Sequence, residues 1–563
     1  MTFLILGSIF STIFSLIISK NNKKIRIVDF FKEPKIVLLN FLPIILCSII
    51  LSKIKFVNGA AVVMVAVNTL ALIHYYKVQF REEPLYFKDI LIFKEAINMS
   101  GQYPLKLNGS ALLYILSIMV AILMQWYKTE FEISTAMLLI SIVCLVAVWY
   151  AIKNERVYRS LTIRDMSPYI ELESYQSKGF LYPFLHSISD IFEYKFKNYS
   201  EKMAVEELSE FEEGKNCDIN FLVIMLESFK DFSTVQGNFE FEIDPYEDFK
   251  KLKVESLSSG LIVDAFGGGT FTTEMQVLSG FYHLPKFKRN TQTYVNYFKD
   301  LGYMTTAHHP YYGGFYNRKQ IYKNIGFESF KYYENYFKNF SEKPLRDREF
   351  FEKLMEDFEE SSKKSKVFSF AVTFQNHGPY TKDIEGEDII KWKENYNEGL
   401  FNYFNNYLRG IKDTSDNLKI LTDKLNKIDK PTVMVLFGDH SPTMGENKSL
   451  IEMLNIEQNL KTVEGVRNLY ETPYLFWANE SLRQRIELCG DGRTIEPAFL
   501  ISELLDKLKI KGNIYSQFLS SYSKEHSVRK DFINLDGQGN FENLGREEKN
   551  KFDNVEYYQQ LKN

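Results

Sequence analysis

Five long apolar runs without charged residues occupy the first 152 residues and limit how this part of the chain can fold. Each is about 17–21 residues long, which in a helix is enough to cross a hydrocarbon core of roughly 30 Å. The runs are residues 2–19, 36–52, 56–76, 111–127 and 133–152. A buried core helix is the ordinary alternative for any single run, but five in series favour a membrane. We therefore predict a five-helix transmembrane domain over residues 1–152.

The residues that flank these runs bear on cleavage and on orientation. The first run lacks a basic region before it and is followed by SKNNKK instead of small residues, so we interpret it as an anchor and not as a cleaved signal peptide. The loop 20–35 carries six Lys/Arg against two acids, and the segment after the fifth run is also basic. By the positive-inside rule, these charges place the C-terminal part of the chain in the cytoplasm.

A different pattern follows the membrane domain. Residues 153–215 are amphipathic and helical in character, and we expect them to form a connector. Over residues 216–526, short apolar runs alternate with amphipathic helical stretches such as 289–301 and 393–426. Runs this apolar are typical of strands buried on both faces of a mostly parallel sheet flanked by helices. We predict an α/β domain here, followed by a polar C-terminal tail over 527–563.

Five of the six predicted strands end in a polar side chain. The six runs are NFLVIML (220–226), LIVDAF (261–266), YMTTA (303–307), KVFSFAVTF (366–374), PTVMVLF (431–437) and PYLFWA (473–478). The polar residues after the first five are Glu227, Thr270, the pair His308 and His309, His377, and the pair Asp439 and His440. Ligands of open α/β sheets gather at the carboxyl ends of strands. Five polar strand ends together are hard to explain by folding needs alone.

Each of these residues also has an ordinary structural explanation. Glu227 could cap a helix, and so could Thr270, since threonine is a favoured N-cap residue. His309 could be a satisfied core histidine. The segments around His377 and Asp439 could be turns.

Taken together, the strand-end residues predict a metal centre. Two carboxylates, an imidazole and a hydroxyl that converge on one point can hold a divalent metal with a position open for substrate. A metal beside Thr270 would lower the pKa of its hydroxyl and make it a nucleophile. The glycines at 267–269 allow close backbone approach, and a helix that starts here points N–H groups at an anion such as phosphate. The cap and nucleophile roles are compatible in geometry.

The motifs MLESFKDF, GGGTFTTEMQVLSG, FYNRKQIYKNIGF, TFQNHGPY and LFGDHSP, in this order behind five apolar runs, resemble those of the lipoteichoic acid synthase family. Members of that family are membrane-bound phosphoglycerol transferases with a sulfatase/alkaline-phosphatase-like extracellular domain. The resemblance covers nearly the whole chain and is specific as a set, whereas GDHSP or GGGT alone would be weak. It implies a multi-pass protein of the cell membrane with its catalytic domain outside the cell. That topology conflicts with the loop charges, and we follow the resemblance, since large domains translocate with little regard for charge.

The resemblance also implies roles for individual residues. Glu227, Thr270, Asp439 and His440 would bind Mn²⁺ or Mg²⁺. Thr270 would be the nucleophile that takes glycerol phosphate from phosphatidylglycerol and releases diacylglycerol, before transfer to a cell-envelope polymer or glycolipid acceptor. His377 would serve in proton transfer or in binding the glycerol phosphate.

Further residues would line the substrate pocket. Arg318 would pair with the phosphate, a role that suits its forked donors, although an ordinary surface arginine is the alternative. His309 would match another pocket histidine. Two positions depart from the family pattern: Tyr316 stands where the family often has Trp, and Tyr311 stands where an acidic residue is expected. These departures bear on the acceptor and on fine specificity.

Other functions fit the sequence less well. A sulfatase takes its nucleophile from a cysteine or serine in a C/S-x-P-x-R setting, whereas Thr270 is followed by Phe-Thr-Thr. A phosphoethanolamine transferase shares the fold and the threonine, but tends to have several disulfides in its soluble domain, where this chain has only Cys217 and Cys489. An inactive module that binds envelope polymer would have a broken metal site, yet every expected ligand position is filled. The net charge of −4 argues against nucleic-acid binding.

Overall fold

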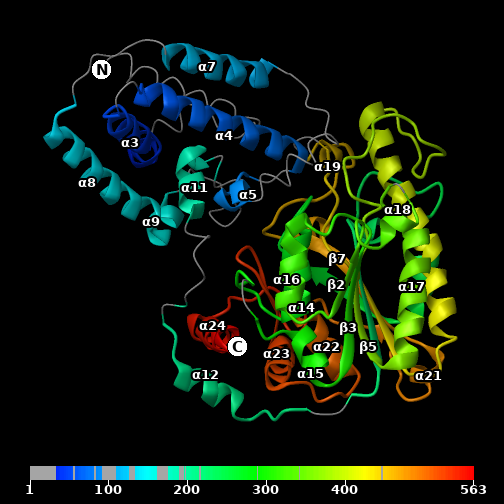
Figure 1. The fold of residues 1–563 in the computed structure, drawn as a ribbon. Helices are drawn as coiled ribbons and strands as arrows, with labels where there is room; N and C mark the ends of the chain where they lie inside the picture. Colours follow the sequence, from blue (N-terminus) through cyan, green and yellow to red (C-terminus); the bar gives the residue numbers. More distant parts are fainter. Residues whose placement is uncertain are drawn as a thin grey trace. The chain divides into compact units, whose positions relative to one another are not determined.

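The structure is a computed structural model, and it describes residues 33–54, 57–81, 84–91, 109–125, 133–161, 175, 177–188, 196, 198–214, 217–287, 290–341, 343–445 and 448–562. The chain divides into two compact units, Met1–Phe192 and Glu193–Asn563. The N-terminal unit is helical and the C-terminal unit is α/β (Figure 1).

The N-terminal unit consists of apolar helices and short connecting helices. Its described helices are α3 (Pro34–Leu51), α4 (Gly59–Arg81), α5 (Phe87–Leu91), α7 (Gly109–Gln125), α8 (Thr135–Ile152), α9 (Glu155–Ser160) and α11 (Leu181–His186). Within the described residues, three helices are long and apolar enough to cross a membrane: α3, α4 over Gly59–Val78, and α8.

The expected spans can be compared with these helices one by one. The three long helices coincide with the runs 36–52, 56–76 and 133–152. The run 111–127 forms α7, whose apolar stretch Ala111–Leu123 is shorter. The run 2–19 lies outside the described residues, so the count of five spans stays a prediction.

The C-terminal unit is built around one eight-stranded sheet. Its strands are β1 (Asn220–Leu226), β2 (Leu257–Ile262), β3 (Tyr303–His309), β4 (Ser329–Tyr332), β5 (Lys366–Val372), β6 (Thr432–Gly438), β7 (Glu471–Ala478) and β8 (Gly490–Asp491). Their order across the sheet is β4-β3-β5-β1-β6-β7-β2-β8. All neighbouring pairs are parallel except β6–β7 and β2–β7. The sheet is therefore mixed and mostly parallel, and β7 alone runs against the others.

Two details of the sheet differ from the sequence prediction. The strand expected at 261–266 ends at Ile262, because the next residue leaves the sheet: the Val263 N–H donates to the carbonyl of Tyr470 outside the strand ladder. The short strands β4 and β8 were not expected. Both lie at the sheet edges, where partial burial replaces the continuous apolar run that marks a central strand.

Helices cover both faces of the sheet (Figure 1). The covering helices are α13 (Glu247–Val254), α14 (Thr270–Ser279), α15 (Tyr294–Asp300), α16 (Arg318–Asn324), α17 (Asp347–Lys364), α18 (Glu398–Leu425), α22 (Leu500–Lys507) and α23 (Ile514–Glu525). In β1, Phe221, Val223 and Met225 belong to one hydrophobic core, and the alternate residues Leu222 and Ile224 belong to the other. The alternation explains why the whole run had to be apolar.

Shorter elements complete the unit. They are α12 (Glu201–Leu208), η2 (Phe232–Thr234), η3 (Phe315–Asn317), η4 (Phe337–Asn339), α19 (Ser449–Met453), α20 (Val463–Tyr470), α21 (Glu480–Arg483), η6 (Pro497–Phe499), β9 (His526–Arg529), β10 (Asn534–Asp536) and α24 (Arg546–Leu561). Residues 527–563, expected to be a polar tail, include most of β9, β10 and α24, and α24 places Phe552 and Val555 in the core. The mixed charges of this segment lie on a helix with one buried face.

Candidate active site

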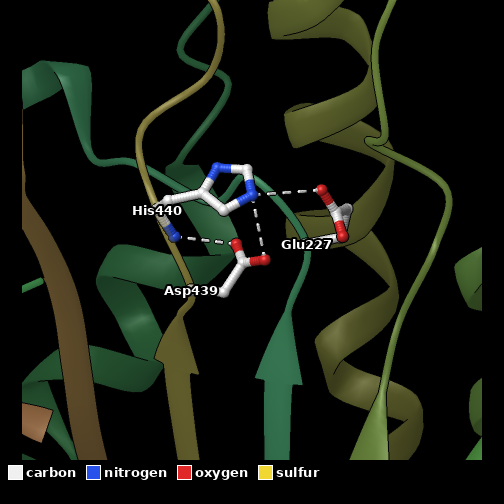
Figure 2. A group of neighbouring side chains, drawn as sticks. All are labelled: Glu227, Asp439 and His440. Carbon is white, nitrogen blue, oxygen red and sulfur yellow. Dashed lines mark hydrogen bonds and ion pairs between the residues drawn. The ribbon is translucent and has the colours of Figure 1, made fainter. Parts of the chain in front are cut away.

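Polar side chains from adjacent strands meet at the carboxyl edge of the sheet. Strands β1 and β6 are parallel neighbours, with Leu226 opposite Gly438 in register. The next residues along the two strands are Glu227 and Asp439, and His440 follows. Figure 2 shows all three side chains pointing toward one another where the two strands end. The strand register thus brings together residues that are more than two hundred positions apart.

The distances within this group are short. His440 Nε2 lies 3.2 Å from Asp439 Oδ2 and 3.7 Å from Glu227 Oε1. The same nitrogen lies 3.2 Å from the Thr270 hydroxyl oxygen. All four residues are buried. We call Glu227, Thr270, Asp439 and His440 the strand-end cluster.

The donor set of the strand-end cluster fits a divalent cation. His440 Nδ1 lies 2.9 Å from the carbonyl oxygen of Ser441, a contact that requires the proton on Nδ1 and directs Nε2 toward the carboxylates. Asp439 Oδ1 accepts the backbone N–H groups of Ser228 and His440, at 2.7 and 2.8 Å. Asp439 Oδ2 is buried and accepts no hydrogen bond from the residues that the structure describes. A buried carboxylate oxygen without a hydrogen-bond donor is costly, and a divalent cation bound here would remove that cost.

Thr270 is the first residue of α14 but does not cap it. The N-cap position belongs to Gly269, whose φ of 94° is in the left-handed region, and Gly267 also has a positive φ of 70°. Only glycine adopts such angles without strain. The cap explanation for Thr270 is therefore wrong. Its hydroxyl points instead to His440, and the Thr273 hydroxyl fixes the same helix by donating to the Asp439 carbonyl at 2.8 Å.

A supporting layer around the cluster was not predicted from the sequence. Ser228 has a φ of 52°, which turns its N–H toward Asp439, and its hydroxyl donates to Glu227 Oε1 at 3.0 Å. The Thr373 hydroxyl, just beyond β5, accepts the Glu227 N–H at 2.9 Å. A serine after the glutamate was visible in the motif MLESFKDF, but the positive φ that gives it this role has no sequence signal outside glycine and asparagine.

Arg318 is buried and not a surface residue. It forms a bidentate pair with Glu274: Nε lies 3.1 and 3.0 Å from the two carboxylate oxygens, and Nη2 lies 2.6 Å from Oε2. The Tyr322 hydroxyl donates to the other oxygen at 2.6 Å. Arg318 Nη1 is buried and donates to no atom of the described chain. Glu274 follows Thr270 by one helical turn, so both project from the same side of α14.

His309 lies at the end of β3 with one nitrogen engaged. Its Nδ1 lies 3.1 Å from the Val372 carbonyl, which requires the proton on that nitrogen. Burial holds the pKa of His309 well below its usual value, and the nearby charges of Arg318 and His377 lower it further. The ring is therefore neutral, and its buried Nε2 is an acceptor without a hydrogen-bond partner among the described residues. The preceding His308 points the other way and contacts Asp357 at 2.7 Å.

His377 lies in a turn after β5, and Tyr316 lies in η3. The His377 ring stacks on Phe374 with centroids 5.0 Å apart, and Phe374 stacks in turn on Tyr311 at 4.0 Å. Tyr316 has a φ of 55°, and its ring lies 5.6 Å from that of Phe271, the residue after Thr270. At the position expected to be acidic, Tyr311 makes an aromatic contact in place of a charged one.

Comparison with known proteins places these features in a family. The sulfatase family model matches residues 219–509, more than half of the chain. A Rhizobium meliloti protein named for cyclic beta-1,2-glucan modification is 28% identical over 325 residues, 54% of this chain and 48% of that protein. Lipoteichoic acid synthase of Staphylococcus saprophyticus is 24% identical over 281 residues, 46% of this chain and 42% of the synthase. The chain thus spans about half or less of the length of these relatives.

Two solved structures share the fold. The Streptococcus pyogenes phosphoglycerol transferase GacH, in complex with sn-glycerol-1-phosphate, aligns with a TM-score of 0.52 and 20% identity over 65% of this chain and 94% of GacH. The integral membrane lipooligosaccharide phosphoethanolamine transferase A of Neisseria meningitidis aligns with a TM-score of 0.53 and 12% identity over 92% of this chain and 98% of its own. With the matched family model and the lipoteichoic acid synthase relatives, the expected resemblance is confirmed. The chain belongs to the sulfatase family.

Proposed function

We propose that this protein is a membrane-bound, metal-dependent phosphoglycerol transferase. It would take glycerol phosphate from phosphatidylglycerol and pass it to a cell-envelope polymer or glycolipid, with its catalytic domain outside the cell. One observation carries the proposal: the Thr270 hydroxyl lies 3.2 Å from His440 Nε2, inside a buried group of two carboxylates and an imidazole. A hydroxyl held there by its own helix start is placed to act as a nucleophile.

The proposed reaction consists of two displacements at phosphorus. First, the Thr270 hydroxyl loses its proton and its oxygen bonds to the phosphorus of phosphatidylglycerol, while the bond from phosphorus to the diacylglycerol oxygen breaks and that oxygen takes up a proton. Second, an acceptor hydroxyl loses its proton and bonds to phosphorus, while the Thr270 oxygen leaves and takes up a proton. His377 is the proposed proton carrier for both steps. A divalent cation, Mn²⁺ or Mg²⁺, would when bound lower the pKa of the Thr270 hydroxyl and offset phosphate charge.

The pocket residues have separate tasks in this proposal. Arg318 Nη1 donates to an oxygen of the glycerol phosphate, and the pairing with Glu274 keeps the guanidinium in a fixed plane. His309, neutral and with Nε2 as an acceptor, receives a hydroxyl of the substrate. Tyr316 borders the threonine through Phe271 and contributes an apolar wall.

Two neighbouring activities share the fold. Phosphoethanolamine transfer uses the same kind of site, and the fold likeness to the Neisseria meningitidis enzyme does not separate the two. We favour phosphoglycerol transfer because the sequence relatives include lipoteichoic acid synthases, and because Cys217 and Cys489 are both free. Sulfate ester hydrolysis is less favoured, since threonine occupies the nucleophile position.

The test uses the full-length protein in detergent with labelled phosphatidylglycerol and Mn²⁺, and follows diacylglycerol release. Thr270→Ala should abolish release, because no other hydroxyl of α14 contacts His440. Thr272→Ala, a change of the same type two residues along the helix, should retain release and serves as the matched control. In the wild type, the covalent intermediate should appear as a glycerophosphoryl mass on the peptide that contains Thr270.

Several results would overturn the proposal. Wild-type turnover in Thr270→Ala would show that Thr270 is not the nucleophile. Faster diacylglycerol release from phosphatidylethanolamine than from phosphatidylglycerol would identify the activity as phosphoethanolamine transfer. A full-length protein that binds metal yet releases diacylglycerol from neither lipid would favour the binding-module alternative.

A further inference from the structure

We propose that Gly410, Thr414 and Asp347 position the turn that carries His377. The inference rests on the proposed function, because it assigns a task to residues that act through His377. None of the three residues belongs to the strand-end cluster. Their common feature is that they contact the two residues before His377 from helices α17 and α18.

The turn begins at Phe374 and ends at His377, whose N–H donates to the Phe374 carbonyl at 3.1 Å. Its first and last rings stack on each other, so the position of the turn sets the position of the imidazole. The residues between them are Gln375 and Asn376. Their side chains contact the two helices; Asn376 is buried and Gln375 is partly buried.

Gln375 ties the turn to both helices. Its Oε1 accepts the backbone N–H of Asp347, the first residue of α17, at 3.0 Å. Its Nε2 donates to the Gly410 carbonyl in α18 at 3.1 Å. One side chain thus satisfies a free donor at a helix start and spans the gap between the helices.

Asn376 extends the contact into a buried chain of hydrogen bonds. Its Nδ2 lies 2.9 Å from the Thr414 hydroxyl, which donates to Asp347 Oδ2 at 2.5 Å. Asn376, Thr414 and Asp347 are all at most 2% exposed. These two hydrogen bonds hold the amide nitrogen of Asn376 in one orientation. Asn376 Oδ1 and Asp347 Oδ1 are buried and accept no hydrogen bond from the described residues.

Gly410 explains why the turn can come so close to α18. A glycine in the interior of a helix is less favourable than alanine, so a close contact is the expected reason for it. A Cβ built at Gly410 would lie 2.4 Å from Asn376 Oδ1, closer than real contacts allow. Gly399, in the first turn of the same helix, has no such neighbour: a Cβ there would meet its nearest atom at 3.4 Å.

The pair of glycines supplies the experiment. Gly410→Ala and Gly399→Ala are made in the full-length protein, and diacylglycerol release, metal content and Tm are measured. For Gly410→Ala we expect kcat to fall about tenfold to a hundredfold, as small displacements of a reacting group do. The KM for phosphatidylglycerol and the metal content should stay unchanged, and Tm should not fall, because alanine favours the helix. Gly399→Ala should match the wild type in kcat, KM and metal content, and its Tm should not fall.

A second measurement does not depend on activity. Hydrogen–deuterium exchange of the backbone over residues 373–380 should be faster in Gly410→Ala and in Thr414→Val than in the wild type. Thr422→Val, a change of the same type elsewhere on α18, should leave exchange over this segment unchanged. If the wild type proves inactive, the proposed function fails, while the exchange data still decide whether the turn is held.

Three results would contradict the inference. One is wild-type kcat in Gly410→Ala under conditions where the wild type is active. Another is exchange over 373–380 that is the same in wild type, Gly410→Ala and Thr414→Val. A fall in Tm or metal content of Gly410→Ala that matches its loss of kcat would also contradict a positioning role.

Discussion

Two groups of histidine and carboxylate side chains in the C-terminal unit have the same chemistry and different surroundings. Both contain two carboxylates and one imidazole, and in each group one ligand atom from every residue lies within 4.8 Å of the others. The first group is the strand-end cluster, without its threonine. The second, which we call the α24 cluster, consists of His283, Asp553 and Glu556. A list of ligand types and distances does not separate them.

In the α24 cluster, the protein itself satisfies the carboxylates. Asp553 Oδ1 pairs with Arg529 Nη1 at 2.9 Å. Glu556 accepts the backbone N–H groups of Tyr282 and His283 and contacts His283 Nδ1 at 2.8 Å. Burial lowers the pKa of His283, but the Glu556 carboxylate outweighs burial, and the pKa lies above its usual value. Arg529 already supplies positive charge next to these carboxylates.

In the strand-end cluster, no lysine or arginine that the structure describes supplies positive charge to Asp439. Among the described residues, neither type forms an ion pair with this carboxylate, and its Oδ2 accepts no hydrogen bond. Nε2 of His440 is the side-chain nitrogen that lies beside both Asp439 and Glu227. The difference teaches that a metal site is recognised by the charge that its own residues leave uncompensated, and not by its ligand types alone.

The largest expected effect comes from replacing one aspartate in each cluster by asparagine and comparing the two variants. Asp439→Asn should lower diacylglycerol release more than a thousandfold, because it removes a charge on which the proposed metal depends. Asp553→Asn should leave kcat near the wild-type value and lower only Tm. Rates are measured on the full-length protein at saturating Mn²⁺. Equal losses of kcat in both variants would remove the functional distinction between the clusters.

An effect of intermediate size is expected for the ion pairs of the two buried arginines, Arg318 and Arg529. Both pair with a carboxylate, and both have buried nitrogens without hydrogen-bond partners within the described chain: Nη1 in Arg318, and Nε and Nη2 in Arg529. Only Arg318 pairs with a residue of the helix that begins at Thr270. Glu274→Leu alone should lower stability by about 3–5 kcal/mol, because it leaves a buried charge unpaired. The double variant Glu274→Leu/Arg318→Met should recover most of that stability and still lose activity. Tm and turnover of the two variants test this, and an active double variant would show that the pair is only structural.

The smallest expected effect concerns Asp347, a buried carboxylate in neither cluster. Burial is the main cause that raises its pKa to about 7; the nearby Asp413 acts in the same direction, while Thr414 and Arg346 oppose the shift. Because this pKa lies above the unfolded value near 3.9, the protonated acid stabilises the fold at low pH, and that stability is lost as pH rises toward 7. Asp347→Asn, which cannot ionise, should therefore gain a few degrees in Tm relative to wild type on going from pH 5 to pH 8. A Tm difference that does not change with pH would contradict the raised pKa.

Much of the fold could be predicted from the sequence, because central strands leave a simple mark. A strand buried on both faces must be apolar throughout, as β1 and β6 are, and the polar residue after it is then conspicuous. Glu227, Asp439 and His440 were predicted in this way, and the structure brings them together with Thr270. Edge strands such as β4 have no such mark.

The supporting contacts could not be predicted, because they join distant positions through the tertiary fold. Glu274 is 44 residues from Arg318 in the sequence, and its position one turn after Thr270 suggested only a helix-start acid. Gly410 lies inside a long helix, where glycine is unfavourable, and the sequence does not reveal the close contact with Asn376 that explains it. Segment 527–563 is polar overall, and its composition does not predict that Phe552 and Val555 lie on one buried face of a helix.

Metal content per chain separates the two clusters most directly. The full-length wild type, Asp439→Asn and Glu556→Gln are loaded with Mn²⁺, freed of excess metal and measured by mass spectrometry. We expect one ion per chain in the wild type, far less than one in Asp439→Asn, and one in Glu556→Gln. Retention of the ion in Asp439→Asn, or its loss from folded Glu556→Gln, would contradict the assignment of the metal to the strand-end cluster.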